Sequence, residues 1–236
     1  MHHVLLDQWS QRVSPLHRRD PRAKILVLLI FLVVLATTAP DAWAALAVYA
    51  ALLMSGILIA GLPLGGLILR AAGILPFSLT FGLVTWLAGD HGRATGLVEK
   101  SYLSTVAVLL VVGTTPLPRL LGGLEALGTP RVLVLLAQFL YRYLFVISEQ
   151  AQHVRVAAAC RAGISQRHRT NRFRAAAGAL AVLFARSYYR AEGIHRAMLS
   201  RAFGNRFTLL SPLRFRLPDV CFTAAIGVFL ILARVQ

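Results

Sequence analysis

The chain has 236 residues, of which 57% are hydrophobic and only 14% are charged. Soluble domains are about 45–50% apolar and about 25% charged, so this composition excludes an ordinary soluble protein and predicts one that lies in a bilayer. The formal charge of +16 would also suit a nucleic-acid-binding protein. No recognition fold is visible, however, and the basic residues coexist with long uncharged stretches, which favours membrane topology as the cause of the charge.

The N-terminal segment, residues 1–24, is predicted to lie on the membrane surface. Leu5, Trp9 and Val13 recur at helical spacing and would form the apolar face of a short amphipathic helix. A frayed terminus is the alternative. The basic residues that follow, together with the apolar run from residue 25, resemble an export signal. Further hydrophobic segments come at once, so we interpret the run as a first membrane span and not as a cleaved leader.

Three more apolar runs follow the first closely, and a fifth closes the chain. A helix needs roughly 20 apolar residues to cross about 30 Å of hydrocarbon, and the lack of period-two alternation excludes barrel strands. The runs carry essentially no ionisable residues, so this chain alone is not expected to be a pump, a channel or an ion-coupled carrier. The predicted spans are residues 25–38, 42–60, 71–88, 102–117 and 220–232.

Between the fourth and the last spans the chain becomes strongly basic, since residues 119–217 hold 16 arginines against three glutamates. By the positive-inside rule this region and the N-terminal segment both face the cytoplasm, which requires an even number of spans between them. We therefore expect an all-α membrane protein with about five transmembrane helices and a cytoplasmic helical domain inserted before the last span. Its parts are residues 1–24, a four-helix transmembrane region over 25–118, the inserted domain over 119–217, and the last span over 218–236.

Residues 132–147 are apolar enough to be a further span. As a span they would place the basic residues 155–174 outside, and they would hold Arg142 near the bilayer centre at a cost of at least ~2.5 kcal/mol. We instead expect a long helix near the membrane surface that runs on to Ala162, followed by a second helix over about 173–203. The inserted domain is then a platform of two long helices.

Each of these helices carries an arginine near its C-terminal end among small residues. Arg161 follows a run of alanines, and Arg201 follows Ala197 by one turn. Small neighbours let another backbone approach closely, and a guanidinium presents a rigid fork to carboxylate or carbonyl oxygens. Two such tips would suit a partner that presents the same pocket twice. The plainer interpretation is that both are ordinary basic residues that complement the helix dipole.

Catalytic and metal-ligating patterns are absent from the sequence. There is no Gly-x-x-x-x-Gly-Lys loop for ATP, no carboxylate pair in the basic region and no His-x-x-x-His spacing. Cys160 and Cys221 form neither a disulfide framework nor a metal-ligand spacing. We expect no catalytic residue, no metal site and no cofactor in this chain, and an energy source supplied by a partner.

Five stretches occur in an order that is typical of one family. Each is weak alone, but the ordered set covers most of the chain. The stretches are SPLHRRDPRAKIL at 14–26, TTP at 114–116, LGTP at 127–130, YRYLFVISE at 141–149 and YYRAE at 188–192. Together they resemble the T components of energy-coupling factor (ECF) transporters, and especially the cobalt-type CbiQ family.

The resemblance implies a docking role for Arg161 and Arg201. In this family two short Ala-Arg-Gly motifs end the coupling helices of the cytoplasmic domain, and their arginines dock into grooves on two ATPase subunits. Alanine stands in both motifs where the family has glycine, which puts any glycine-specific backbone bend in doubt. The matching positions with their small neighbours are Ala159, Cys160, Arg161 and Ala162 in the first motif, and Ser200, Arg201 and Ala202 in the second.

The resemblance also implies the function. The chain would be the non-catalytic, transmembrane energy-coupling subunit of an ATP-driven importer for cobalt, or else for nickel or another substrate, in the bacterial inner membrane with its N-terminus in the cytoplasm. Expected partners are two copies of a cytoplasmic ATPase subunit that binds ATP and Mg, a substrate-binding membrane subunit, and membrane lipid. Some importers of this kind would add a small accessory membrane subunit. No nucleic acid is expected as a partner. The alternatives are a permease of an ordinary ABC transporter, which lines the pathway itself, and an intramembrane enzyme.

Overall fold

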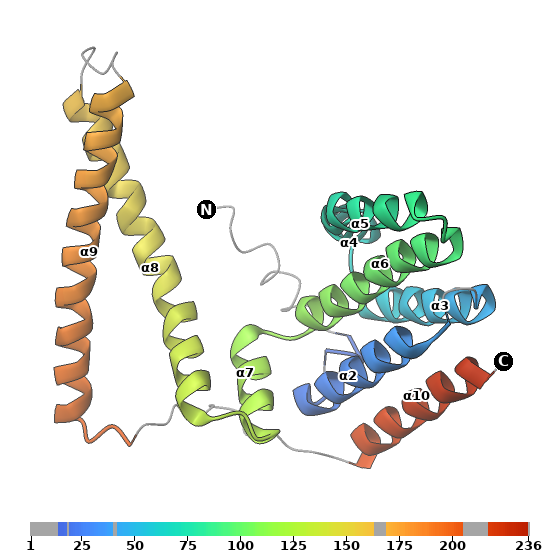
Figure 1. Cartoon of the computed structure of the whole chain (residues 1–236). Coiled ribbons are helices and arrows are strands. Elements are labelled where there is room, and N and C mark those ends of the chain that lie inside the picture. The colour runs from blue at the N-terminus through green and yellow to red at the C-terminus, as the bar shows by residue number, and fades with distance from the viewer. Residues whose placement is uncertain (1–13, 18, 40–41, 163–168, 205–216, 236) are drawn as a thin grey trace. The chain divides into compact units, whose positions relative to one another are not determined.

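The computed structural model is helical wherever it is described (Figure 1). It describes residues 14–17, 19–39, 42–162, 169–204 and 217–235, without the side chains of 161–162, 169–172 and 235. The predicted all-α class is thereby confirmed, and the predicted amphipathic helix before residue 14 lies outside the described residues. The chain divides into two compact units, Met1–Thr129 with Leu209–Gln236, and Pro130–Thr208.

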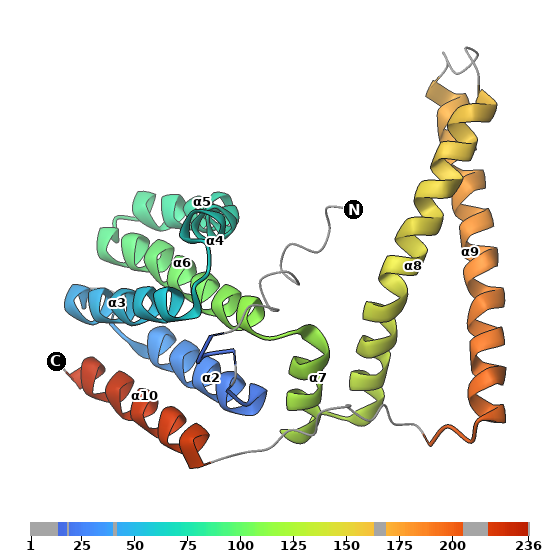
Figure 2. The same cartoon turned by 180° about the vertical axis from the view of Figure 1, so that it is seen from behind.

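The first unit is a stack of helices in which α6 takes the central place. Against α6 pack α2, α3, α4 and α5, while α7 and α10 pack on α2 (Figures 1 and 2). A 3-10 turn, η1 (Ala72–Ile74), separates α4 from α5. The described helices of this unit are α2 (Pro21–Thr37), α3 (Trp43–Ala60), α4 (Leu64–Ala71), α5 (Leu75–Leu87), α6 (His91–Thr114), α7 (Leu117–Ala126) and α10 (Leu217–Val235).

Local chemistry explains where the two central helices begin. Asp20 is the N-cap of α2, and its carboxylate accepts a hydrogen bond from the Arg22 amide at 2.9 Å. Pro21 follows in the first turn, where a missing amide hydrogen costs nothing. Asp90 caps α6 in the same way, accepting from the Arg93 amide at 3.2 Å. Both helices therefore start at an aspartate that satisfies amides left without an intrahelical partner.

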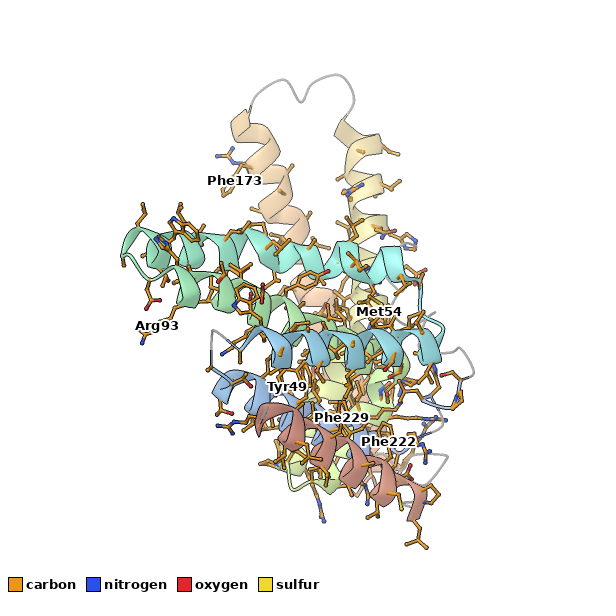
Figure 3. All side chains as sticks on the ribbon, turned by 90° about the vertical axis from the view of Figure 1, so that its right-hand side faces the viewer. Tyr49, Met54, Arg93, Phe173, Phe222 and Phe229 are labelled. Atoms are coloured by element: carbon orange, nitrogen blue, oxygen red, sulfur yellow. The ribbon has the colours of Figure 1, made fainter. Side chains whose placement is uncertain are left out.

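The core of the first unit is apolar and joins α2, α3, α6 and α10. Tyr49 of α3 and Leu230 of α10 are fully buried in it. Phe31 of α2 meets the Tyr49 ring edge-on, with ring centroids 6.0 Å apart, and the Tyr49 hydroxyl lies 3.4 Å from Thr38 Oγ1. The polar end of this tyrosine thus has a partner inside the core, on the side of α3 that faces α2 (Figure 3).

The outer surface of the first unit is also apolar, as expected for a protein whose solvent is lipid. Leu83 of α5, Leu58 of α3 and Ile231 of α10 are more than half exposed. Five helical segments within the described residues are long and apolar enough to cross a membrane, which confirms the predicted class of multi-pass membrane protein. They are Trp43–Ala60, Leu64–Leu87, His91–Thr114, Arg131–Cys160 and Leu217–Arg234.

This set of five differs from the predicted one. α2 has 17 residues and is shorter than each of the five, whereas the segment that contains residues 132–147 is among them by length and composition. The surface position of 132–147 and the spanning role of 25–38 both stay predictions. The spans were expected to carry essentially no ionisable residues, but α6 begins at His91, earlier than the predicted span over 102–117, so this candidate span includes Glu99 and Lys100.

The second unit is a hairpin of two long helices, α8 (Arg131–Ala162) and α9 (Arg169–Ser200), each of 32 residues. They run in opposite directions side by side (Figures 1 and 2). The prediction of two long helices in this region is confirmed, with α9 beginning a little earlier than expected. From Pro130 to Thr208 the sequence holds 13 arginines and two glutamates, so most of the net charge of the protein belongs to this hairpin.

Candidate functional site

The end of α9 places the second predicted docking arginine at a defined turn. The Phe203 amide donates to Met198 O and the Ala202 amide to Leu199 O, both at 3.1 Å. These two bonds form a Schellman motif, in which Arg201 is the helix C-cap and Ala202 is the next residue. Ala202 has φ +50°, in the left-handed region that glycine usually fills. The bend that was in doubt is therefore present with alanine in the glycine position.

The side chains at this tip are accessible. Ser200, Arg201 and Ala202 are all exposed, and the Ser200 hydroxyl donates back to Ala197 O at 3.0 Å, so it adds no bulk beyond the helix. The Arg201 guanidinium makes no hydrogen bond or ion pair within the described part of the chain. A partner can thus approach the helix end closely and reach the guanidinium directly.

The first predicted docking arginine lies at the other end of the hairpin. Arg161 and Ala162 are the last residues of α8, and the side chains of both lie outside the description. The preceding Ala159 and Cys160 are exposed, and Cys160 is a free thiol. Since α9 returns over 32 residues at about 1.5 Å per residue, Arg201 and the end of α8 are roughly 48 Å apart. The structure therefore does not gather the two arginines into one site.

Between its ends, the exposed surface of α9 is basic and aromatic. Tyr188 and Tyr189 are 63% and 74% exposed, and Arg190 beside them is exposed as well. Arg196 pairs with Glu192 one turn earlier, in a charge pair open to solvent. Exposed pairs of this type contribute little stability, so this face is available for contacts with other molecules.

A second arrangement, which the sequence did not predict, joins α2 and α6. Lys24 at the start of α2 is 3% exposed, and its ammonium donates to Thr114 O at 3.0 Å and to Thr115 Oγ1 at 2.7 Å. Thr114 is the last residue of α6. At the opposite end, the Lys100 ammonium of α6 donates to Thr38 O, the C-cap carbonyl of α2. Each helix thus supplies the cation that caps the other's C-terminus, where the macrodipole is negative.

These two residues, Lys24 and Lys100, are the two lysines of the sequence, among 25 basic residues. An ammonium is compact and can enter a buried site that a planar guanidinium cannot fill in the same way. The contact also explains why two stretches far apart in the chain belong together, because the 14–26 stretch and the 114–116 stretch meet at Lys24. The sequence held one signal for these contacts, namely two lysines in a chain whose other Lys and Arg positions are all arginine.

Other contacts fix the same end of α2 against its neighbours. Arg19 reaches α10, with its guanidinium 3.6 Å from the Asp219 carboxylate and 5.5 Å from the centre of the Phe222 ring. Gly123 of α7 lies so near α2 that a β-carbon there would come within 3.1 Å of Ile25 Cδ1. The stretch that resembles a family signature is therefore the place where α2, α6, α7 and α10 meet.

No metal centre is found in the part of the chain that the structure describes, since no three His, Cys, Asp or Glu side chains come together there. What the structure does define is a multi-pass membrane protein with a basic helical hairpin whose two ends carry exposed small residues. A family model described as cobalt transport protein, CbiQ, matches residues 12–209. The chain belongs to that family, and is accordingly a membrane component of cobalt transport.

Two relatives support the assignment. The cobalt transport protein CbiQ of Rhodobacter capsulatus is 29% identical over 206 residues, which cover 82% of this chain and 83% of the relative. An uncharacterized protein of Methanocaldococcus jannaschii is 28% identical over 186 residues, covering 73% of this chain and 67% of the relative. Both similarities extend over most of the chain and include far more than the five short stretches.

Proposed function

We propose that this chain is the transmembrane energy-coupling subunit of an ECF-type importer for cobalt ions. Family membership supports transport, and the name of the Rhodobacter capsulatus relative supports cobalt as the substrate. The observation that carries the coupling role is the placement of two arginine tips at opposite ends of one stiff hairpin. A single ligand-binding site has no use for two arginines about 48 Å apart, but two copies of one partner do.

The proposed partner is a pair of identical ATPase subunits, each with a groove for one tip. Arg201 would enter one groove and Arg161 the other, because exposed alanine, serine and cysteine neighbours leave room for close approach. ATP binding draws the two ATPase subunits together. Helices of 32 residues do not shorten, so the hairpin must turn or shift as a body when its two ends are moved.

That movement would pass to a separate substrate-binding membrane subunit, which reorients and releases the ion inward. This chain then binds neither ATP nor the ion and catalyses no reaction. We place the hairpin and the N-terminus in the cytoplasm of a bacterial cell and the apolar helices in its inner membrane, since arginine-rich segments stay on the cytoplasmic side. An ordinary ABC permease would instead line the ion pathway with its own residues.

Co-purification tests the proposal. The transporter is expressed with all its subunits, this chain is tagged, and ATPase recovered in mild detergent is compared between wild type and Arg161→Glu with Arg201→Glu. Removing one partner of a desolvated charge contact costs about 2–5 kcal/mol, so ATPase recovery should fall at least about 30-fold. Arg155→Glu with Arg190→Glu is the matched control, because these arginines lie on the same two helices, are exposed, and stand six and eleven residues before the tip arginines.

The outcomes separate three cases. Loss of ATPase from the tip variant alone supports docking through Arg161 and Arg201. Equal loss from both variants means that ATPase binds the hairpin through overall charge, and the tip assignment is then wrong. If wild-type protein brings down no ATPase under conditions that keep other transport complexes intact, the coupling role itself is wrong.

A further inference from the structure

A cavity of about 550 Å³ opens between α5 and α6 in the first unit. Its walls are almost entirely apolar, and one of them belongs to α5, which packs on α6 and η1 and exposes large side chains on its remaining surface. One carboxylate interrupts the apolar lining. The side chains that matter here are Leu79, Leu83 and Trp86 of α5 and Thr95, Val98 and Glu99 of α6.

Glu99 is half-buried in this cavity and forms no hydrogen bond or ion pair with any residue that the structure describes. The nearby cations are already engaged. Lys100 is turned to Thr38 O on α2, and successive residues of a helix point about 100° apart, so its ammonium does not face Glu99. Arg93 is paired with Asp90 at 3.2 Å and projects away from the helices at the start of α6 (Figure 3).

An unpaired carboxylate in a membrane-crossing helix is costly and marks a site whose partner lies elsewhere. α6 is one of the five segments long and apolar enough to cross a membrane, and Glu99 is eight residues, roughly 12 Å, along it from His91. The headgroup layer on each side of a bilayer is only about 5–7 Å thick. With the start of α6 at the membrane surface, Glu99 lies below the headgroup layer, where a long basic side chain on a neighbouring helix reaches it and a lipid ammonium does not.

We propose that the α5–α6 groove is a docking site for a transmembrane helix of another subunit, which places a lysine or arginine opposite Glu99. The basic residue lies within about three turns of that helix's end, because Glu99 itself lies roughly 12 Å from the end of α6. The rest of the contact is apolar and follows Leu79, Leu83 and Val98. The inference rests on the proposed function in one respect, that the partner is a membrane subunit of the same importer.

Site-specific photocrosslinking in membranes of cells that express the whole transporter tests the site. A benzophenone amino acid replaces Leu83 in the groove, and Val228 of α10, which is similarly exposed at 57% against 60%, serves as the control position. We expect an adduct from position 83 to one span of another membrane subunit that has a lysine or arginine near its end. Position 228 should not give that adduct.

Charge variants then separate the carboxylate from the apolar groove. Glu99→Lys should lower the adduct yield about three- to thirty-fold, the range for one polar contact between membrane helices. Exchange of the partner's basic residue for glutamate should restore the yield in that background. Glu99→Gln, which keeps the size of the side chain, should lower the yield less and keeps the test valid if the lysine variant folds poorly.

Three results would overturn the inference: adducts to lipid only, adducts to a second copy of this chain, or a yield that Glu99→Lys leaves unchanged. Recovery of ATPase with the tagged chain is measured on the same membranes. If ATPase is recovered while the groove gives no protein adduct, the docking site is wrong and the proposed function stands. If neither ATPase nor a protein adduct is found, the proposed coupling role is wrong, and the docking site that rests on it is wrong as well.

Discussion

Replacing Lys24 by methionine should destabilise the first unit strongly. The side chain is 3% exposed and its ammonium makes two hydrogen bonds, one to the last carbonyl of α6 and one to Thr115 Oγ1. Hydrogen bonds from a charged donor contribute about 1.5–3 kcal/mol each, and part of this is offset because methionine buries no charge. We expect a net loss of about 2–4 kcal/mol, equivalent to a lower melting temperature by roughly 4–16 °C for a protein of this size.

The reciprocal contact provides matched variants. Lys100→Met removes one bond to Thr38 O from a half-buried side chain and should cost about 1–2 kcal/mol. The two contacts lie 14 residues apart along each helix, Lys24 and Thr38 on α2 and Lys100 and Thr114 on α6. This separation is about 21 Å, so the losses of stability should add in the double variant. Lys24→Arg should not restore stability, because a guanidinium is larger and cannot be enclosed in the same space.

Thermal unfolding of the purified protein in one detergent, followed by tryptophan fluorescence at a fixed heating rate, provides the comparison. A melting temperature for Lys24→Met within about 2 °C of wild type would mean that burial of the ammonium cancels its hydrogen bonds. A Lys24→Arg variant as stable as wild type would refute the argument that this site selects lysine for its compact shape.

Three further substitutions should change stability in the same assay. Ala202→Gly should stabilise the end of α9 by about 0.5–1 kcal/mol, because glycine adopts the left-handed φ of +50° without the strain of a β-carbon; a decrease would show that the bend is not strained. Gly123→Val should cost about 1–3 kcal/mol, since even a β-carbon there comes within 3.1 Å of Ile25 Cδ1, whereas an unchanged melting temperature would mean that α7 shifts freely. Asp20→Ala should cost about 1 kcal/mol through loss of the α2 N-cap, and Asp20→Asn, which keeps an acceptor, should retain most of it.

The sequence predicted the elements of this protein well where composition decides them. Uncharged apolar runs predicted α3 to within one residue and α10 to within three residues at each end. The two long helices of the hairpin were predicted as well. The start of α6 was placed too late because Arg93, Glu99 and Lys100 broke the apolar run. A cap at Asp90 begins the helix there regardless of hydropathy, since capping acts on backbone amides and not on side-chain polarity.

The candidate sites also divide into those that a short stretch of sequence indicates and those that depend on contacts between distant residues. Arg161 and Arg201 could be singled out because small neighbours and local resemblance are properties of a short stretch. The Lys24 and Lys100 contacts could not, because each depends on a carbonyl more than 60 residues away in the sequence, and nothing in a hydropathy pattern sets the register of two antiparallel helices. Glu99 was hidden for a related reason: its lack of a partner becomes visible only when its surroundings are known.

The end of α9 separates two properties that glycine normally combines. The family resemblance places glycine after the docking arginine, and glycine is both free to adopt the left-handed region and flexible within it. This chain keeps the left-handed bend at Ala202 with the two Schellman hydrogen bonds intact, yet alanine has fewer backbone states to sample. For the proposed docking, a stiffer bend holds Arg201 ready at the helix end and reduces the entropy lost on binding. Alanine thus supplies the bend at this position in this chain, at the cost of some strain in the free protein.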